Sequence, residues 1–275
     1  MSLFAEFALK KNSDEIVHIS EVDRGLKCDC YCAACGEDLI ARKGNIKIYH
    51  FAHFSAECKY GRETALHLAA KKLIEKEQKI WLPASIVRCK NGKISIPRGL
   101  ACVDSVKIEK KIGEIIPDVI VTLGGETILV EIFVTHGVDK IKTNKIQNME
   151  LSCVEFDLSS CSESAVTINL LNSRLIKGTG RVRWVNDVWA EEVEDNLHAY
   201  SEELQANDNF QVFPSYCCRK GFAFGSTIDY CLCYKCSHCI EVDLFSNDSK
   251  HATIHCIARI GSMNYENLNK KLSHF

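Results

Sequence analysis

Two aliphatic, β-branched runs flank a Gly-Gly pair near the middle of the chain. Residues 115–121 and 127–134 each have the length and composition of a strand. Gly124-Gly125 is a two-residue hairpin signal, because glycine takes positive φ without steric cost. Both runs are apolar on both faces, which is typical of strands in a sheet covered on each side. The pattern therefore predicts a buried central hairpin.

This hairpin brings two carboxylates together. Counting outward from the turn places Asp118 directly opposite Glu131, with their Cβ atoms about 4.5–5.5 Å apart. Two carboxylates repel each other, and burying either one unpaired is costly. A bound divalent cation would resolve this conflict. The alternatives are that the register slips or that both acids lie at a solvated end of the sheet.

Helical periodicity is clearest over residues 63–79, where small and aliphatic residues recur among lysines and glutamates. The remaining pattern predicts a charged helix at residues 139–146. It also predicts strands at residues 15–19, 80–87, 94–96 and 153–158, and a hairpin formed by residues 39–41 and 46–49. The order helix, strands, helix, strand predicts an α/β core with a mixed sheet flanked by helices.

The chain divides into four predicted segments. They are an N-terminal zinc-binding β module (1–60), the α/β core (61–165), a helical connector (166–209) and a C-terminal cysteine-rich zinc-binding module (210–275).

Composition indicates a globular cytoplasmic protein. The 275 residues are 46% hydrophobic and 25% charged, and no apolar run approaches the roughly 20 residues that span a bilayer. The first ten residues lack the charged-then-apolar order of a signal peptide, so we expect a cytoplasmic location. In a reducing cytosol, clustered cysteines are better interpreted as zinc ligands than as disulfides. Four isolated cysteines are expected to be core thiols: Cys89, Cys102, Cys153 and Cys161.

The first cysteine cluster has the parts of a zinc knuckle. Cys32-x-x-Cys35-Gly puts two thiolates on a tight turn, and the next hairpin supplies two further ligands. Our first choice of ligands is Cys32, Cys35, His53 and Cys58. Cys28 and Cys30 offer competing ligands, so the set stays open.

A second structural zinc site is expected near the C-terminal end. The spacing Cys233-x-x-Cys236-x-x-Cys239 supplies three ligands, with Cys217 or Cys218 upstream. We assign Cys218, Cys233, Cys236 and Cys239, although six cysteines and His238 compete for four places.

The predicted helix 63–79 offers a third acid. Glu63 and His67 lie four residues apart and share one helix face with Lys71. An acid on a helix beside a carboxylate hairpin is typical of Mg²⁺ sites, since this hard ion prefers oxygen ligands. The alternative is an exposed Glu-His-Lys stripe. Residues 1–111 also carry an excess of basic residues, which is compatible with a polyanionic partner.

With these residues in place, the chain resembles the CoiA-like nuclease family, related to the competence protein CoiA and a branch of the PD-(D/E)xK nucleases. The likeness covers roughly residues 15–185. It rests on Gly25-Leu26-Lys27-Cys28, Cys35-Gly36, Ala41-Arg42-Lys43-Gly44, His50-Phe51-Ala52-His53, Glu63-Thr64-Ala65-Leu66-His67, Lys71, Pro117-Asp118, Glu131, Val134-Thr135-His136, Lys142 and Glu155-Phe156-Asp157-Leu158-Ser159.

The resemblance implies a nuclease in which Glu63, Asp118 and Glu131 hold Mg²⁺ or Mn²⁺. The chain departs from the family pattern where a lysine is expected two residues after the second acid, because Phe133 stands there. Lys142 on the following helix could replace that lysine. His136 could instead orient water or phosphate, and we assign His67 to the same site.

We therefore expect a metal-dependent DNA endonuclease, acting in defence against foreign DNA or in DNA processing. The expected partner is DNA, with a targeting protein and a homodimer both compatible with the sequence and no membrane association expected. The zinc modules would grip the nucleic-acid backbone or stiffen a small domain. The alternatives are a catalytically inactive zinc-ribbon DNA-binding or scaffold protein, which Phe133 favours, and a structural protein in which the acids form salt bridges.

Overall fold

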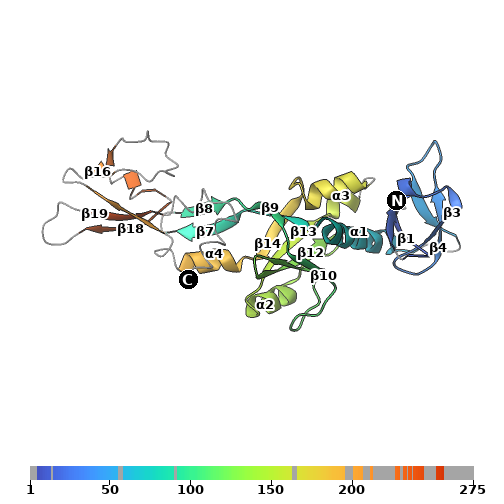
Figure 1. The fold of residues 1–275 in the computed structure, drawn as a ribbon, viewed down its shortest axis with the longest axis horizontal. Coiled ribbons are helices and arrows are strands. Elements are labelled where there is room, and N and C mark those ends of the chain that lie inside the picture. The colour runs from blue at the N-terminus through green and yellow to red at the C-terminus, as the bar shows by residue number, and fades with distance from the viewer. Residues whose placement is uncertain are drawn as a thin grey trace. The chain divides into compact units, whose positions relative to one another are not determined.

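A computed structural model describes residues 5–13, 15–54, 58–89, 92–162, 166–195, 201–206, 211–212, 227–229, 232–233, 235–236, 238–244 and 252–256. The chain divides into two compact units, Met1–Pro83 with Leu100–Asn186 and Ala84–Gly99 with Asp187–Phe275. Both units combine helices with β-sheets, so the architecture is mixed α/β as expected (Figure 1).

The first unit begins with a five-stranded sheet in the order β2-β1-β3-β4-β5. Its strands are β1 (Phe7–Lys10), β2 (Ile16–His18), β3 (Gly25–Tyr31), β4 (Asp38–Arg42) and β5 (His50–His53). Alternate residues of β4 are buried, which places Leu39 and Ala41 in a core with Phe51. The predicted hairpin is present, but its second strand was placed four residues too early. Ile46 and Ile48 suggested a strand, whereas both are exposed in the loop that precedes β5.

Helix α1 (Gly61–Glu77) agrees with the predicted helix to within two residues. It ends where Gln78 adopts a left-handed conformation and its N–H bonds to the carbonyl of Ile74. The predicted strand 80–87 is two strands, β6 (Lys79–Leu82) and β7 (Ser85–Cys89). The strand is interrupted at Pro83, because proline has no N–H to donate.

A second five-stranded sheet forms the core of this unit, in the order β10-β11-β12-β13-β14. The strands are β10 (Ser105–Ile108), β11 (Val119–Leu123), β12 (Glu126–Phe133), β13 (Ser152–Asp157) and β14 (Arg181–Asn186). Strands β12 and β13 are parallel and are connected through α2 (Lys140–Asn148), whereas the other neighbours are antiparallel. The hairpin register predicted from the Gly-Gly turn is confirmed, since Leu123 pairs with Glu126.

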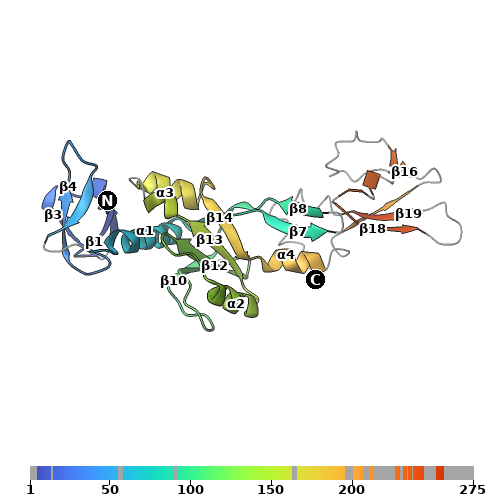
Figure 2. The same cartoon turned by 180° about the vertical axis from the view of Figure 1, so that it is seen from behind.

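Helices cover both faces of this sheet. In Figures 1 and 2, α1 and α3 (Ile168–Leu175) lie on one side of the strands and α2 lies on the other. Ile146 of α2 packs against Ile120, Leu129 and Cys153, which are fixed on one face by strand alternation. The central strands are therefore buried on both faces, as their composition predicts.

The predicted helical connector was wrong over residues 181–186. This segment is β14, the edge strand beside β13, and its alternating sequence Arg-Val-Arg-Trp-Val fits a strand. Flanking helical patterns masked that signal. The expectation of four core thiols was also wrong in part, because Cys153 and Cys161 are buried whereas Cys102 is exposed and Cys89 is half-buried.

Buried polar contacts join the N-terminal module to α1 and to the segment between β13 and α3. Arg62 of α1 forms an ion pair with Glu6 at 3.1 Å and donates to the carbonyl of Cys161 at 2.9 Å. His18 lies 3.0 Å from the carbonyl of Val166. The N-terminal module and the central sheet consequently form one compact unit.

The second unit contains the hairpin of β7 and β8 (Gly92–Ile96), packed on α4 (Val188–Asp195). Val87, Ile94, Ile96 and Val193 form its buried core. Its other strands are β15 (Glu202–Gln205), β16 (Gln211–Val212), β17 (Ile228–Asp229), β18 (Cys239–Leu244) and β19 (Ala252–Cys256). The four predicted segments remain a prediction, since compactness alone does not show which parts fold independently.

Across the described residues, no helix has both the length and the apolar character needed to cross a membrane.

Candidate functional site

A row of ionisable side chains crosses the central sheet. Val119 pairs with Val130, so Asp118, one residue before β11, lies opposite Glu131. Glu131 pairs in parallel with Glu155 of β13, and Glu155 pairs with Arg183 of β14. Opposed residues on neighbouring strands share a face. We call Asp118, Glu131 and Glu155 the carboxylate row.

Asp118 contacts two basic side chains of α1, His67 and Lys71. The Nζ of Lys71 is 2.8 Å from Oδ1 of Asp118, and Nδ1 of His67 is 3.5 Å from the same oxygen. The N–H of Ile132 donates to Oδ2 at 2.8 Å. Burial alone would raise the pKa of Asp118, but the hydrogen bonds from His67 and Lys71 outweigh burial and hold the pKa well below its usual range.

Glu131 is a buried acid whose pKa is strongly raised. The Nζ of Lys142 is 2.7 Å from both carboxylate oxygens, but only Oε2 accepts a hydrogen bond in good geometry. Among the described residues, none donates a hydrogen bond to the buried Oε1. Burial and the charges of Asp118 and Glu155 raise the pKa of Glu131 to about 7, against the lowering effect of Lys142. Oε1 therefore lies in contact with the ammonium group of Lys142 but accepts no well-aligned hydrogen bond from the described residues.

Lys142 reaches Glu131 because α2 follows β12 directly. Asp139 caps α2 by accepting from the N–H of Lys142 at 2.7 Å, which fixes the first turn of the helix. The side chain of Lys142 then extends back to the sheet. Phe133, where the family pattern has lysine, is half-buried and carries no charge. Lys142 thus places an ammonium group beside the second acid, from a different element.

Glu63 lies one turn before His67 on α1. Its Oε1 accepts a hydrogen bond from Thr135, whose hydroxyl is also 2.8 Å from Nδ1 of His136. The loop between β12 and α2 thus connects Glu63 with His136. Among the described residues, the three oxygens of Glu63, Asp118 and Glu131 do not all lie within 4.8 Å of one another. The assigned Mg²⁺ ligands share one region without forming a closed ligand set.

Glu155 is a member of the site that the sequence analysis did not assign. Its Oε2 accepts from the N–H of Val138 at 2.6 Å, and its Oε1 accepts from Arg183 at 2.8 Å. A Cβ at position 137 would lie 3.0 Å from Oε2, so Gly137 allows the close approach. Glu155 therefore holds the loop that leads to Lys142. A parallel pairing of residues 131 and 155 would have revealed it, but no turn fixes that register in the sequence.

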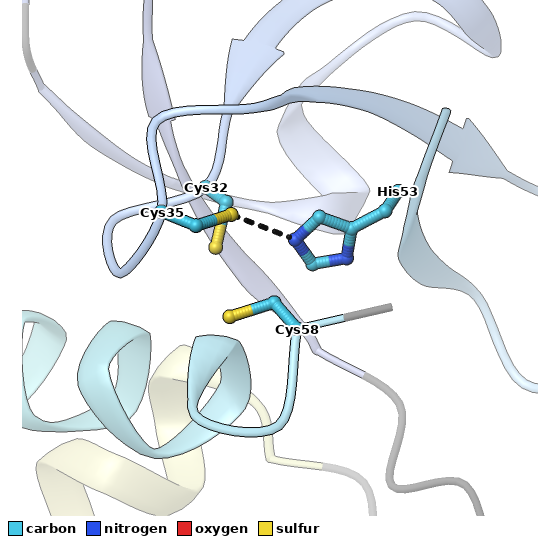
Figure 3. A group of neighbouring side chains, drawn as sticks. All are labelled: Cys32, Cys35, His53 and Cys58. Atoms are coloured by element: carbon cyan, nitrogen blue, oxygen red, sulfur yellow. Dashed lines mark hydrogen bonds between the residues drawn. The ribbon is translucent and has the colours of Figure 1, made fainter. Parts of the chain in front are cut away.

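The first cysteine cluster is assembled as predicted. Cys32, Cys35, His53 and Cys58 place one ligand atom each within 4.8 Å of one another (Figure 3). Cys32 follows β3, Cys35 lies in the turn before β4, His53 ends β5 and Cys58 precedes α1. Three thiols and one imidazole are a ligand set that suits a tetrahedral zinc ion. This group could hold zinc.

Local geometry supports that interpretation. The N–H of Ala34 points to the sulfur of Cys32 at 3.4 Å, and Nε2 of His53 is 3.4 Å from the sulfur of Cys35. A Cβ at Gly61, the first residue of α1, would lie 3.0 Å from the sulfur of Cys32. The glycine therefore lets the helix start directly against the four ligands. Figure 3 shows Cys58 in the segment that leads into this helix.

The competing cysteines Cys28 and Cys30 lie elsewhere. Both are buried in the core of the N-terminal sheet, where the thiol of Cys28 donates to the carbonyl of Leu39 at 3.2 Å and that of Cys30 to the carbonyl of Cys28 at 3.0 Å. Among the described residues, the group whose ligand atoms lie within 4.8 Å of one another contains neither of them.

The C-terminal zinc site stays a prediction. Cys233, Cys236 and Cys239 follow one another through turns, with hydrogen bonds from the N–H of Cys236 to Cys233 and from that of Cys239 to Cys236. They pack against Ile254 and its neighbours in one cluster. Cys218 lies outside the described residues.

Comparison with protein families matches residues 15–61 to the model described as "Competence protein CoiA, N-terminal domain". The match covers strands β2 to β5 of the N-terminal sheet and all four residues of the Cys3His cluster. Comparisons with curated proteins and with solved structures gave no match. Residues 15–61 are thus similar to the CoiA N-terminal domain, and the central sheet lies beyond the match.

Proposed function

We propose that this protein is a metal-dependent DNA endonuclease, with its active site at the carboxylate row of a PD-(D/E)xK-like core. The observation that carries the proposal is the adjacency of Asp118 and Glu131 on neighbouring strands, with the ammonium group of Lys142 beside Glu131. A mixed sheet flanked by helices, with a parallel strand after the crossover helix, supplies the expected setting. The CoiA N-terminal domain match supports the resemblance over the first part of the chain.

The residues present fit a divalent cation. Glu63 of α1 and the facing acids Asp118 and Glu131 of the central hairpin supply hard oxygen donors, and Oε1 of Glu131 accepts no well-aligned hydrogen bond from the described residues. Glu63, Asp118 and Glu131 would hold Mg²⁺ or Mn²⁺. When bound, the ion would lower the pKa of a coordinated water and neutralise charge on a phosphodiester.

The remaining groups then have defined tasks. Lys142 would stabilise negative charge on the phosphate. His136, oriented by Thr135, offers a nitrogen that could accept a proton or contact a phosphate oxygen. Lys71 and His67 hold Asp118 ionised, so this acid is ready to act as a ligand. We propose that the Cys3His cluster binds a structural zinc ion.

A cleavage assay tests this function. Wild-type protein, incubated with plasmid or single-stranded DNA, should cut in Mg²⁺ or Mn²⁺ and not in EDTA. Glu131→Ala should abolish cutting while circular dichroism shows a folded protein. Glu126→Ala, an exposed acid at the hairpin turn, is the matched control and should cut normally. Full activity of folded Glu131→Ala would remove Glu131 from the site.

A second function is favoured by a specific observation. Lys71 and Lys142 already neutralise Asp118 and Glu131. In a DNA-binding or scaffold protein without nuclease activity, these ion pairs would simply stabilise the sheet. Such a protein would bind DNA equally with and without Mg²⁺ and would not cut, and the same assay therefore separates the two functions.

A further inference from the structure

A basic pocket lies on the N-terminal module, away from both candidate metal sites. Its volume is about 470 Å³, within the range of ligand pockets. It is formed by the end of β4, the loop 43–49 and the start of β3. None of the residues assigned to the zinc cluster or the carboxylate row lines it.

The charged side chains that line this pocket are all basic. Arg24, Arg42, Lys43 and Lys47 contribute to it, and none of the described residues that line it is acidic. Lys43 also donates to the carbonyls of Ser20 and Val22, which ties the loop to the module. A concave surface lined by several cations and by no acidic residue attracts anions.

The same loop exposes apolar side chains. Ile46 is 98% exposed, and Ile48 and Tyr49 are also exposed. The ammonium group of Lys43 lies 5.9 Å from the centre of the Tyr49 ring. Exposed aliphatic and aromatic groups among cations match the chemistry of single-stranded nucleic acid, which presents phosphates together with accessible base faces. A duplex would satisfy the cations but would keep its base faces stacked.

We propose that this basic pocket binds single-stranded nucleic acid, with Arg24, Arg42 and Lys47 contacting phosphates and Ile46, Ile48 and Tyr49 contacting bases. The β4–β5 hairpin is held firmly enough for this task. Nδ1 of His50 lies 2.7 Å from the carbonyl of Ile48, and β5 ends at His53 of the zinc cluster. This inference rests on the proposed function only for the choice of nucleic acid as the ligand, since binding in the pocket requires no cutting.

The test is fluorescence anisotropy of the full chain with labelled oligothymidine, without added Mg²⁺ and across a range of salt concentrations. Arg24→Gln/Arg42→Gln/Lys47→Gln removes three phosphate contacts. Each contact contributes about 0.7 to the slope of log affinity against log salt, so the slope should fall by about 2 and affinity by about 100-fold at 0.1 M salt. Lys10→Gln/Lys27→Gln/Lys76→Gln removes three exposed charges outside the pocket and is the matched control.

Ile46→Ser/Ile48→Ser tests the base contacts separately. It should weaken oligothymidine binding and leave the salt slope unchanged, because no charge is removed. An unchanged affinity of the Arg24/Arg42/Lys47 variant, or an equal loss in the control, would overturn the site. Duplex DNA binding as tightly as oligothymidine would overturn the single-strand assignment. Because binding and cutting are measured apart, loss of the proposed nuclease function would leave this result intact.

Discussion

At the residue scale, the central feature is the contrast between Asp118 and Glu131. The two acids are neighbours, yet hydrogen bonds from His67 and Lys71 keep Asp118 ionised while burial raises the pKa of Glu131 to about 7. Neighbouring groups with separated pKa values are typical of functional sites. Here the cause is the number of donors that each carboxylate receives.

Glu131 should make the metal-free protein less stable as pH rises. Its pKa is raised in the folded state, so its favourable contribution is full below the unfolded value of 4.5 and is lost as pH rises to about 7. We expect Glu131→Gln to raise the free energy of unfolding by about 3 kcal/mol at neutral pH, because an amide carries no charge to bury. Urea unfolding of wild type and variant at several pH values measures the difference. Parallel pH profiles between pH 4.5 and 7 would contradict this prediction, and Glu114→Gln, an exposed acid, serves as control.

At the scale of elements, two loops position the chemistry. The turn before β4 and the start of α1 assemble the Cys3His cluster, and the loop between β12 and α2 connects the carboxylate row with Lys142. Both loops rely on a glycine where a Cβ would approach a functional atom, at Gly61 and Gly137.

Gly61→Ala should weaken zinc binding although it improves helix propensity. An alanine in a helix normally stabilises by about 1 kcal/mol relative to glycine. Here its Cβ would lie 3.0 Å from the sulfur of Cys32 and would displace a ligand. Elemental analysis after dialysis against a weak chelator should find about one zinc fewer per chain than in wild type. The exposed-thiol variant Cys102→Ser should keep its full zinc content, and full retention in Gly61→Ala would show that the cluster tolerates the methyl group.

Glu155→Gln should reduce cutting about 10–100-fold, the usual loss when a group that supports metal ligands is changed. The amide weakens the contacts to Val138 and Arg183 that hold the loop before α2. Because Glu155 acts through this loop, the Mg²⁺ concentration for half-maximal cutting should also change. The comparison is with Glu126→Gln, and equal Mg²⁺ dependence of the two variants would assign Glu155 a purely structural role.

The sequence predicted local features well and distant pairings poorly. The Gly-Gly turn predicted the register of the central hairpin, and the expected group Cys32, Cys35, His53 and Cys58 is brought together, because its members lie on or beside consecutive elements of the chain. Glu155 pairs with Glu131 across a crossover helix, and it pairs with Arg183 across a long connection. No local pattern encodes these registers. The strand β14 was missed although its sequence alternates, because flanking helical patterns masked that signal.

At the scale of the whole molecule, the N-terminal module and the central sheet belong to one compact unit, Met1–Pro83 with Leu100–Asn186. The ion pair of Arg62 and Glu6, with both side chains largely buried, ties the N-terminal module to α1, and Arg62 also donates to the carbonyl of Cys161 beyond β13. The region similar to the CoiA N-terminal domain, residues 15–61, thus belongs to the same compact unit as the carboxylate row.

Arg62→Ala should lower the free energy of unfolding by about 3–5 kcal/mol, because it leaves the buried Glu6 without its partner. Guanidinium unfolding monitored by circular dichroism measures this change. Arg88→Ala breaks the pair with Glu194, in which Arg88 is exposed, and should cost less than about 1 kcal/mol. Similar losses in the two variants would contradict the role of Arg62 as a buried connection.

The measurement that most directly tests the central claim is Mn²⁺ binding by the zinc-loaded protein, followed by electron paramagnetic resonance. The account predicts saturable binding in wild type and in Glu114→Gln, and its loss in both Asp118→Asn and Glu131→Gln. Folded variants that bind Mn²⁺ as wild type does would contradict a metal site at the carboxylate row.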